Sequence, residues 1–123
     1  MFELSDDQFQ QMIDDALGEM PKIRLEHLKN VAILFADEPD DMQRENLRLR
    51  DDQSLFGLYE GVPLPFRQGQ TMLLPDRITL FKNPILNASH DAYSLKDQIK
   101  KTLWHEMAHY YGLDHAKIHE LEG

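Results

Sequence analysis

The chain has 123 residues, of which 41% are hydrophobic and 28% are charged, the balance of an ordinary globular protein. No stretch reaches the apolar length of a membrane span and no charged-then-apolar leader opens the chain, so we expect a cytoplasmic protein with one domain over residues 1–123. The formal net charge of −9 disfavours nucleic-acid partners, and the absence of cysteine excludes disulfides and thiolate metal sites.

The first predicted element is a helix that Ser5 caps and Pro21 ends. Asp6 and Asp7 follow the cap, where acidic side chains interact favourably with the helix dipole. Apolar residues then recur at helical spacing and predict a core-facing side: Phe9, Met12, Ile13, Ala16, Leu17 and Met20. Residues 23–28 are compatible with a further short helical turn.

The middle of the chain predicts strands and loops. Residues 31–36 form a continuous apolar run, which favours a buried strand, and the acidic cluster at 37–41 ends it as a solvated turn. Residues 42–50 are ambiguous and compatible with a helical turn. Further strands are predicted at 55–59 and at 77–81, the second closed by Asn83-Pro84.

Between these two strands, Gly61, Pro63, Pro65, Gly69 and Pro75 indicate a loop over residues 61–76, which we place at the wall of a cleft.

The last long helix is predicted to begin at Ser94, which could form a capping box with Asp97. One side of this helix is apolar and is expected to pack into the core, through Ile99, Leu103, Met107 and Tyr110. A second stripe is expected to face a cleft, and it consists of Gln98, Thr102, His105 and His109. Trp104, Ala108 and Tyr111 cover much of the remaining circumference, so we expect a centrally buried helix.

Residues 105–115 contain the pattern HExxHxxGxxH. His105 and His109 lie one helical turn apart, so both imidazoles can hold one metal ion, while Glu106 is rotated by about 100° and lies beside that ion. Gly112 permits the left-handed backbone that ends a helix and returns His115 as a third ligand. Three protein ligands with one open position are typical of catalytic Zn²⁺, with Glu106 as the general base of peptide hydrolysis.

Other polar residues have weaker patterns. Asp114, next to the third ligand, could orient a histidine or serve as a ligand. A tyrosine hydroxyl could stabilise an oxyanion, and the candidates, each of which also suits a core or rim position, are Tyr59, Tyr93, Tyr110 and Tyr111. The remaining histidines have no ligand spacing to one another and are interpreted as surface residues: His27, His90 and His119. His119 lies four residues beyond His115, so a role as ligand stays open for it.

The chain resembles the small bacterial zincin-like metallopeptidases that are sometimes called minizincins. The resemblance rests on residues 58–64 (LYEGVPL), residues 75–81 (PDRITLF) and the HExxHxxGxxH helix. It implies an α+β fold, in which a small mixed β-sheet packs against an N-terminal helix and a long C-terminal active-site helix. It also implies a Zn²⁺ cofactor held by His105, His109 and His115. Members of this family often carry an acidic residue where His115 stands, so the third ligand is closer to that of the metzincins.

Two alternatives remain open. The chain also resembles the metal-dependent endoribonucleases of rRNA maturation, whose HxxxHxxGxDH pattern His105, His109, Gly112, Asp114 and His115 satisfy. Those enzymes usually have glycine at the position of Glu106, and the acidic charge argues against RNA. The other alternative is a non-catalytic binding module that zinc stabilises.

The sequence thus favours a zinc metallopeptidase that acts on a peptide or protein, with no nucleic-acid or membrane partner. We further expect the substrate to pair with an exposed sheet edge, at the strand at 55–59 or at 77–81.

Overall fold

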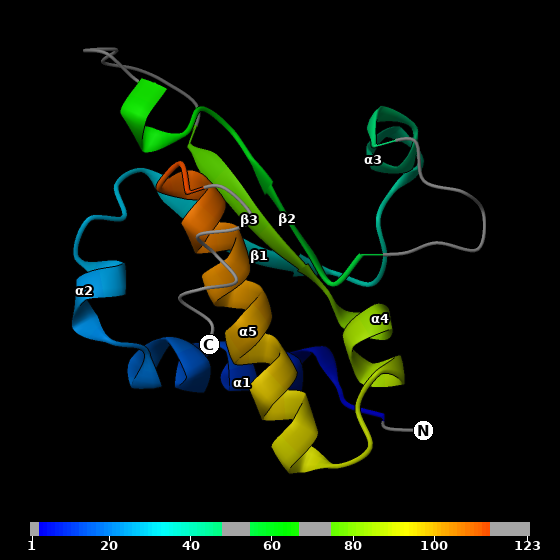
Figure 1. The fold of residues 1–123 in the computed structure, drawn as a ribbon. Helices are drawn as coiled ribbons and strands as arrows, with labels where there is room; N and C mark the ends of the chain where they lie inside the picture. Colours follow the sequence, from blue (N-terminus) through cyan, green and yellow to red (C-terminus); the bar gives the residue numbers. More distant parts are fainter. Residues whose placement is uncertain (1–2, 48–54, 67–74, 114–123) are drawn as a thin grey trace.

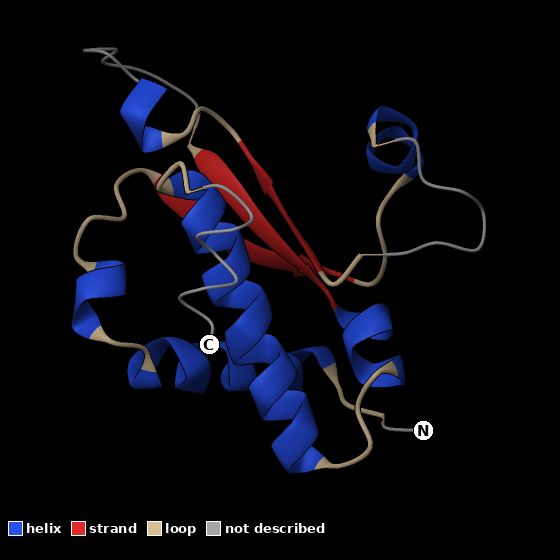
Figure 2. Ribbon diagram, in the orientation of Figure 1, coloured by secondary structure: helices blue, strands red, loops and turns tan. Residues whose placement is uncertain are grey.

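The computed structural model describes residues 3–47, 55–66 and 75–113. The chain begins with the helices α1 (Asp6–Glu19) and α2 (Lys22–Leu25) and continues through strand β1 (Val31–Ala36), helix α3 (Asp41–Asn46) and strand β2 (Gly57–Glu60). A 3₁₀ turn (Leu64–Phe66), strand β3 (Asp76–Phe81) and the helices α4 (Lys82–Asn87) and α5 (Ala92–Tyr110) follow. Among the described residues this is an α+β arrangement with a small mixed sheet, as the sequence predicted (Figures 1 and 2).

The sheet has the strand order β1-β3-β2, with β3 in the centre. Strand β1 runs parallel to β3, with Ile33 opposite Ile78, whereas β2 runs antiparallel to β3, with Tyr59 opposite the same Ile78. Helix α5 crosses the sheet diagonally, and α1 passes behind the N-terminal half of α5 (Figure 1). Side chains alternate between the two faces of a strand, so only one side of each strand meets these helices.

The core lies between that face of the sheet and the two long helices. Helix α1 contributes Phe9, Ile13 and Ala16, all fully buried or nearly so. Strand β3 contributes Ile78 and Leu80, and α5 contributes a row at helical spacing that consists of Leu95, Ile99, Leu103, Met107 and Tyr110. The predicted core-facing sides of both helices are confirmed.

The predicted N-cap of α5 is wrong by three residues. Asp91 caps the helix, its carboxylate accepting a hydrogen bond from the Ser94 backbone N–H, while the Ser94 hydroxyl accepts one from the Asp91 N–H. Ser94 therefore belongs to a capping box, but at position N3 of the helix and not at the N-cap. Both side chains are good caps, so sequence spacing alone did not decide between them.

One further expectation about the middle of the chain is wrong. Strand β1 is an edge strand of the described sheet and not a buried one, and Leu34 on it is 45% exposed. The strand predicted at 77–81 is β3, which ends at Phe81 as expected, and Asn83-Pro84 after it lies in the first turn of α4. Proline is tolerated there because first-turn N–H groups have no partner within the helix. The short helices α2 and α3 overlap the ranges 23–28 and 42–50, where the sequence allowed a helical turn, and residues 48–50 lie outside the described residues.

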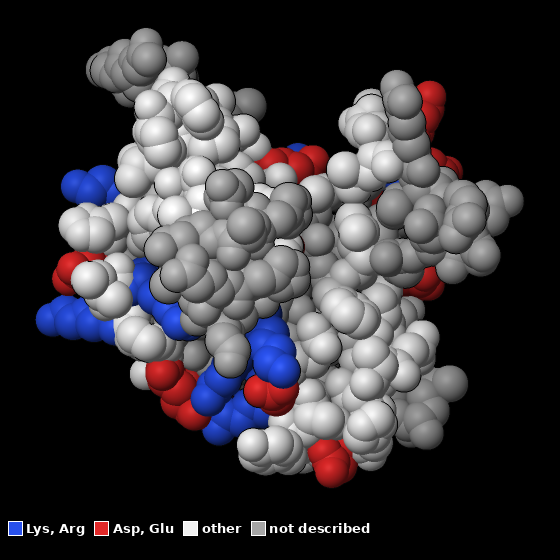
Figure 3. All heavy atoms as spheres, viewed as in Figure 1, with Lys and Arg blue, Asp and Glu red and all other residues white. Residues whose placement is uncertain are grey.

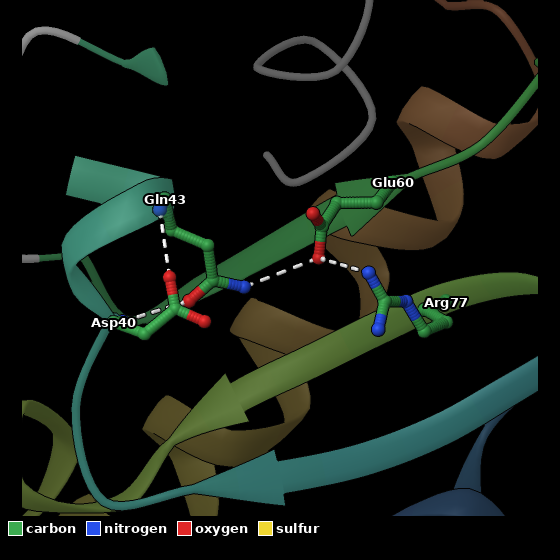
Figure 4. Close-up of polar contacts among 4 residues, drawn as sticks. All are labelled: Asp40, Gln43, Glu60 and Arg77. Carbon is green, nitrogen blue, oxygen red and sulfur yellow. Dashed lines mark hydrogen bonds and ion pairs between the residues drawn. The ribbon is translucent and has the colours of Figure 1, made fainter. Parts of the chain in front are cut away.

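Helix α3 lies at the other face of the sheet, where a polar contact joins it to β2 (Figure 4). The Gln43 side-chain amide donates to the Glu60 carboxylate at 3.2 Å, and Arg77 lies 3.5 Å from that carboxylate. Asp40 caps α3 in a capping box with Gln43. The opposite face of the sheet, which packs against α5, holds the site described next.

No helix in the described ranges is both long enough and apolar enough to cross a membrane.

Candidate metal centre and active site

The two histidines of the HExxH segment converge on one point. Both lie in the last two turns of α5, and their Nε2 atoms are 3.3 Å apart. Two nitrogens bound to one tetrahedral zinc at about 2.0–2.1 Å would be separated by about 3.3–3.4 Å. The rings are partly exposed and inclined at 76°, so an ion could reach both nitrogens from outside the helix. This pair of imidazoles therefore fits zinc in donor type and in spacing.

Helix α5 ends in the way the motif predicts. Gly112 has φ 81°, and its N–H donates to the carbonyl of His109, while the Leu113 N–H donates to that of Ala108. These two bonds form a Schellman motif, which needs a left-handed residue at the position of Gly112. A Cβ on Gly112 would also come within 2.8 Å of the Pro65 side chain. Glycine is thus required for both conformation and space.

The predicted third ligand, His115, and its neighbour Asp114 lie outside the described residues, as does His119. Within the described ranges, no group of three or more His, Cys, Asp or Glu side chains is placed to hold a metal ion. The described part of the site is accordingly the histidine pair and Glu106.

Glu106 lies beneath strand β2 and is only 7% exposed. Its carboxylate accepts a hydrogen bond from the backbone N–H of Tyr59. Burial raises the pKa of Glu106 to about 7, and the bond from Tyr59 opposes part of this increase. A carboxylate with such a pKa can both accept and return a proton near neutral pH, which is the property of a general base.

Gly57 makes this close approach of helix and strand possible. A Cβ at this position would lie 2.6 Å from the Thr102 methyl group and 3.3 Å from the Glu106 Cγ. Thr102 was predicted to face the cleft, but it is buried against β2, and its hydroxyl accepts a hydrogen bond from the Gln98 side chain. The predicted cleft stripe is therefore divided, with the histidines partly exposed and Thr102 covered.

Strand β2 is the sheet edge beside Glu106. The prediction that residues 77–81 could form the exposed edge is wrong, because β3 pairs on both sides with β1 and β2. The alternative strand, predicted at 55–59, is β2 at Gly57–Glu60, and among the described strands it has a neighbour on one side only. The loop after it folds into the 3₁₀ turn whose Pro65 approaches Gly112, and residues 67–74 of the predicted cleft wall lie outside the described residues.

The hydroxyls of three candidate tyrosines are engaged elsewhere. Tyr59 donates to the Asp76 carboxylate, Tyr110 donates to the His27 carbonyl and accepts from the Lys29 N–H, and Tyr111 donates to the Arg24 carbonyl. Tyr93 is 82% exposed and lies twelve residues before His105, about 18 Å along the helix axis. None of the four hydroxyls is placed at the histidine pair.

Two residues that the sequence did not single out shape this site, namely Gly57 and Asp76. Asp76 is 7% exposed, and its carboxylate accepts hydrogen bonds from the Tyr59 hydroxyl and from the Val62 N–H. Gly61, with φ 150°, leaves room for that carboxylate, which a Cβ would overlap. The glycines gave the only sequence signal, because a glycine in or after a strand can mark a close approach of two backbones.

The sequence can be compared with models of known protein families. The sequence model of the zincin-like metallopeptidase family matches residues 28–123. The chain belongs to the zincin-like metallopeptidase family. The match leaves out α1, although α1 packs against α5 in the core.

One solved structure extends this likeness to the fold. A conserved hypothetical protein from Thermus thermophilus superposes with a TM-score of 0.57, and the alignment covers 88% of this chain and 94% of the other. The two sequences are 17% identical, so this zincin-like chain shares the fold with that protein. No curated protein matches the sequence. At the family level, membership supports a metallopeptidase-like hydrolase that uses zinc.

Proposed function

We propose that this zincin-like chain is a zinc-dependent peptidase in which His105, His109 and His115 hold the metal and Glu106 is the general base. The observation that carries the proposal is the 3.3 Å separation of the His105 and His109 Nε2 atoms on the helix that also carries the buried Glu106. Gly112 supports the assignment of His115, because its left-handed turn ends the helix three residues before that histidine.

Zinc, when bound, would supply a Lewis acid that polarises the peptide carbonyl and makes a coordinated water more acidic. Glu106 would accept the proton that the attacking water loses and deliver it to the leaving nitrogen as the C–N bond breaks. The Tyr59 N–H would hold the Glu106 carboxylate in place during both transfers. Burial beneath β2 keeps bulk water from competing for that carboxylate.

We also propose that the substrate is a peptide in extended form, paired with the outer edge of β2. Main-chain pairing with an edge strand fixes a peptide bond in register beside Glu106. A structure of the complex in which the peptide crosses the helices without pairing to β2 would overturn this part of the proposal.

The site also favours a peptide over RNA as the substrate. A buried carboxylate beside the histidines supports a peptidase over an endoribonuclease, as does the family match.

On the face shown in Figure 3, basic side chains lie next to acidic ones. Lys96 and Lys100 both pair with Glu19, and Lys101 pairs with Asp97. These pairs reduce the basic surface that a polyanion would need.

The first experiment is zinc content per chain after purification without chelator. We expect about one zinc per chain, lost in His109→Ala and in His115→Ala and retained in the control His90→Ala, because the exposed His90 lies outside the motif. Failure to bind zinc on titration would overturn the proposal.

The second experiment separates catalysis from zinc binding. Glu106→Gln should keep the zinc and lower peptide turnover by about 10²- to 10⁴-fold, because only the proton-transferring group is changed. A binding module would instead lose its fold in His109→Ala and keep its function in Glu106→Gln. Equal turnover of Glu106→Gln and the unsubstituted protein would therefore favour the non-catalytic interpretation.

A further inference from the structure

Strand β2 is short, although it positions a backbone group that contacts Glu106. It has four residues, and among the described strands it pairs only with β3, so it receives fewer ladder hydrogen bonds than the central strand. Short edge strands open locally at low free-energy cost. Yet the Tyr59 N–H on this strand holds the carboxylate of Glu106. Something outside the β2–β3 ladder must therefore fix the position of Tyr59.

Asp76 supplies two contacts of the required kind. One oxygen of its carboxylate accepts a hydrogen bond from the Tyr59 hydroxyl, and the other accepts one from the Val62 N–H at 3.3 Å. The carboxylate thus contacts β2 at Tyr59 and the loop three residues later. Hydrogen bonds to a charged acceptor are stronger than neutral ones, and burial shields these two from competing water.

The anchor itself is fixed by the rest of the sheet. Asp76 is the first residue of the central strand, it lies opposite Val31 of β1, and its N–H donates to the Asn30 carbonyl at 2.9 Å. Gly61 lies directly against the Asp76 side chain, in a conformation and at a distance that exclude other residues. The anchor therefore belongs to the best-supported strand, and the segment it holds belongs to the least-supported one.

We propose that Asp76 is a positioning residue for Glu106 and that it acts through Tyr59. The phenol of Tyr59 is held at its far end by Asp76, and the backbone N–H of the same residue holds the catalytic carboxylate. The inference rests on the proposed function for the role of Glu106 as general base. In the contacts described, Asp76 reaches Tyr59 and Val62 but neither the histidines nor Glu106, so it is a positioning residue and not a catalytic one.

The test compares two substitutions that break the link at its two ends. Asp76→Asn removes the charge, and Tyr59→Phe removes only the phenol hydroxyl and leaves the backbone N–H in place. The matched control is Tyr111→Phe, which also deletes a hydrogen-bonded hydroxyl from a side chain next to α5, but one bound to the Arg24 carbonyl at 2.6 Å. All three proteins are studied with zinc bound.

The first readout does not depend on activity. Hydrogen exchange of the backbone amide of residue 59 should become at least about tenfold faster in Asp76→Asn and in Tyr59→Phe, because β2 loses its contact with the Asp76 carboxylate. Exchange at Ile78 and Leu80 in the central strand should stay within about twofold, and Tyr111→Phe should leave Tyr59 unchanged. Unchanged exchange at Tyr59, or an equal increase at all three amides, overturns the inference. If Asp76→Asn does not fold, Tyr59→Phe decides alone.

The second readout is turnover of the same zinc-bound proteins. We expect kcat to fall by about 10- to 100-fold with zinc content unchanged, because the base is displaced while the metal ligands remain. Faster exchange at Tyr59 without a loss of kcat overturns the positioning role. If the unsubstituted zinc-bound protein has no turnover, the proposed function fails. A structure of Tyr59→Phe then decides the inference, which is overturned if Glu106 keeps its bond to the residue 59 N–H.

Discussion

Helices α1 and α5 pack into the same core, yet they bury different kinds of side chain. Both begin with a capping box, and α1 buries three residues that are all apolar: Phe9, Ile13 and Ala16. Helix α5 buries nine residues, and two of them, Thr102 and Glu106, are polar. Packing alone does not require a buried carboxylate, and its burial opposes ionisation. The comparison separates a helix that buries apolar side chains alone from one that also buries a carboxylate at a cost in stability.

The largest effect on the unfolding free energy should come from removing the Glu106 carboxylate, measured in the metal-free protein. The pKa of Glu106 is raised by burial from 4.5 to about 7, so ionisation stabilises the unfolded state relative to the fold. The wild-type unfolding free energy should therefore fall as pH rises from about 4.5 to 7 and level off above that range. In Glu106→Gln this dependence is absent.

The expected gain of Glu106→Gln at pH 8 is about 3 kcal/mol, since one pKa unit corresponds to about 1.4 kcal/mol. Near pH 4.5 the two proteins should unfold at the same denaturant concentration. Urea unfolding in the presence of a chelator at both pH values measures this difference. Equal midpoints at pH 8 would contradict the view that α5 sacrifices stability for its carboxylate.

The second effect concerns the contact between α5 and β2. Gly57→Ala would place a Cβ 2.6 Å from the Thr102 methyl group, which requires strand and helix to separate. Overpacking of this kind costs about 1–3 kcal/mol, and the displaced Tyr59 N–H should also reduce turnover. Thermal unfolding and kcat are the measurements. A Gly57→Ala protein as stable and as active as the wild type would show that this glycine is not needed for space.

The smallest effect is expected in α1, and it is a stabilisation, unlike the effect of Gly57→Ala. Gly18 lies within this helix, and a Cβ there would meet no atom within 4 Å. Gly18→Ala should therefore stabilise the protein by about 0.5–1 kcal/mol, because alanine lowers the conformational entropy of the unfolded chain. Turnover should not change. Destabilisation by Gly18→Ala would mean that α1, too, is constrained by more than packing.

The sequence by itself determined the two long helices, their core-facing sides and the histidine pair. These features depend on residues within one or two turns of each other, so the spacing of 3.6 residues per turn fixes them locally. The left-handed turn at Gly112 belongs to the same class, since its conformation follows from the residue type. The family resemblance, too, rested on such local patterns and is confirmed.

Only the tertiary structure decided which strand forms the edge beside the helix, and that Asp76 contacts Tyr59. Strand order joins segments that are far apart in the chain, and an apolar run has the same pattern in an edge strand such as β1 as in a buried one. The bond between the Tyr59 hydroxyl and Asp76 spans seventeen residues, and no spacing rule connects positions that meet only through β-pairing. The histidines could thus be predicted from one helix, while the support of Glu106 required the whole sheet.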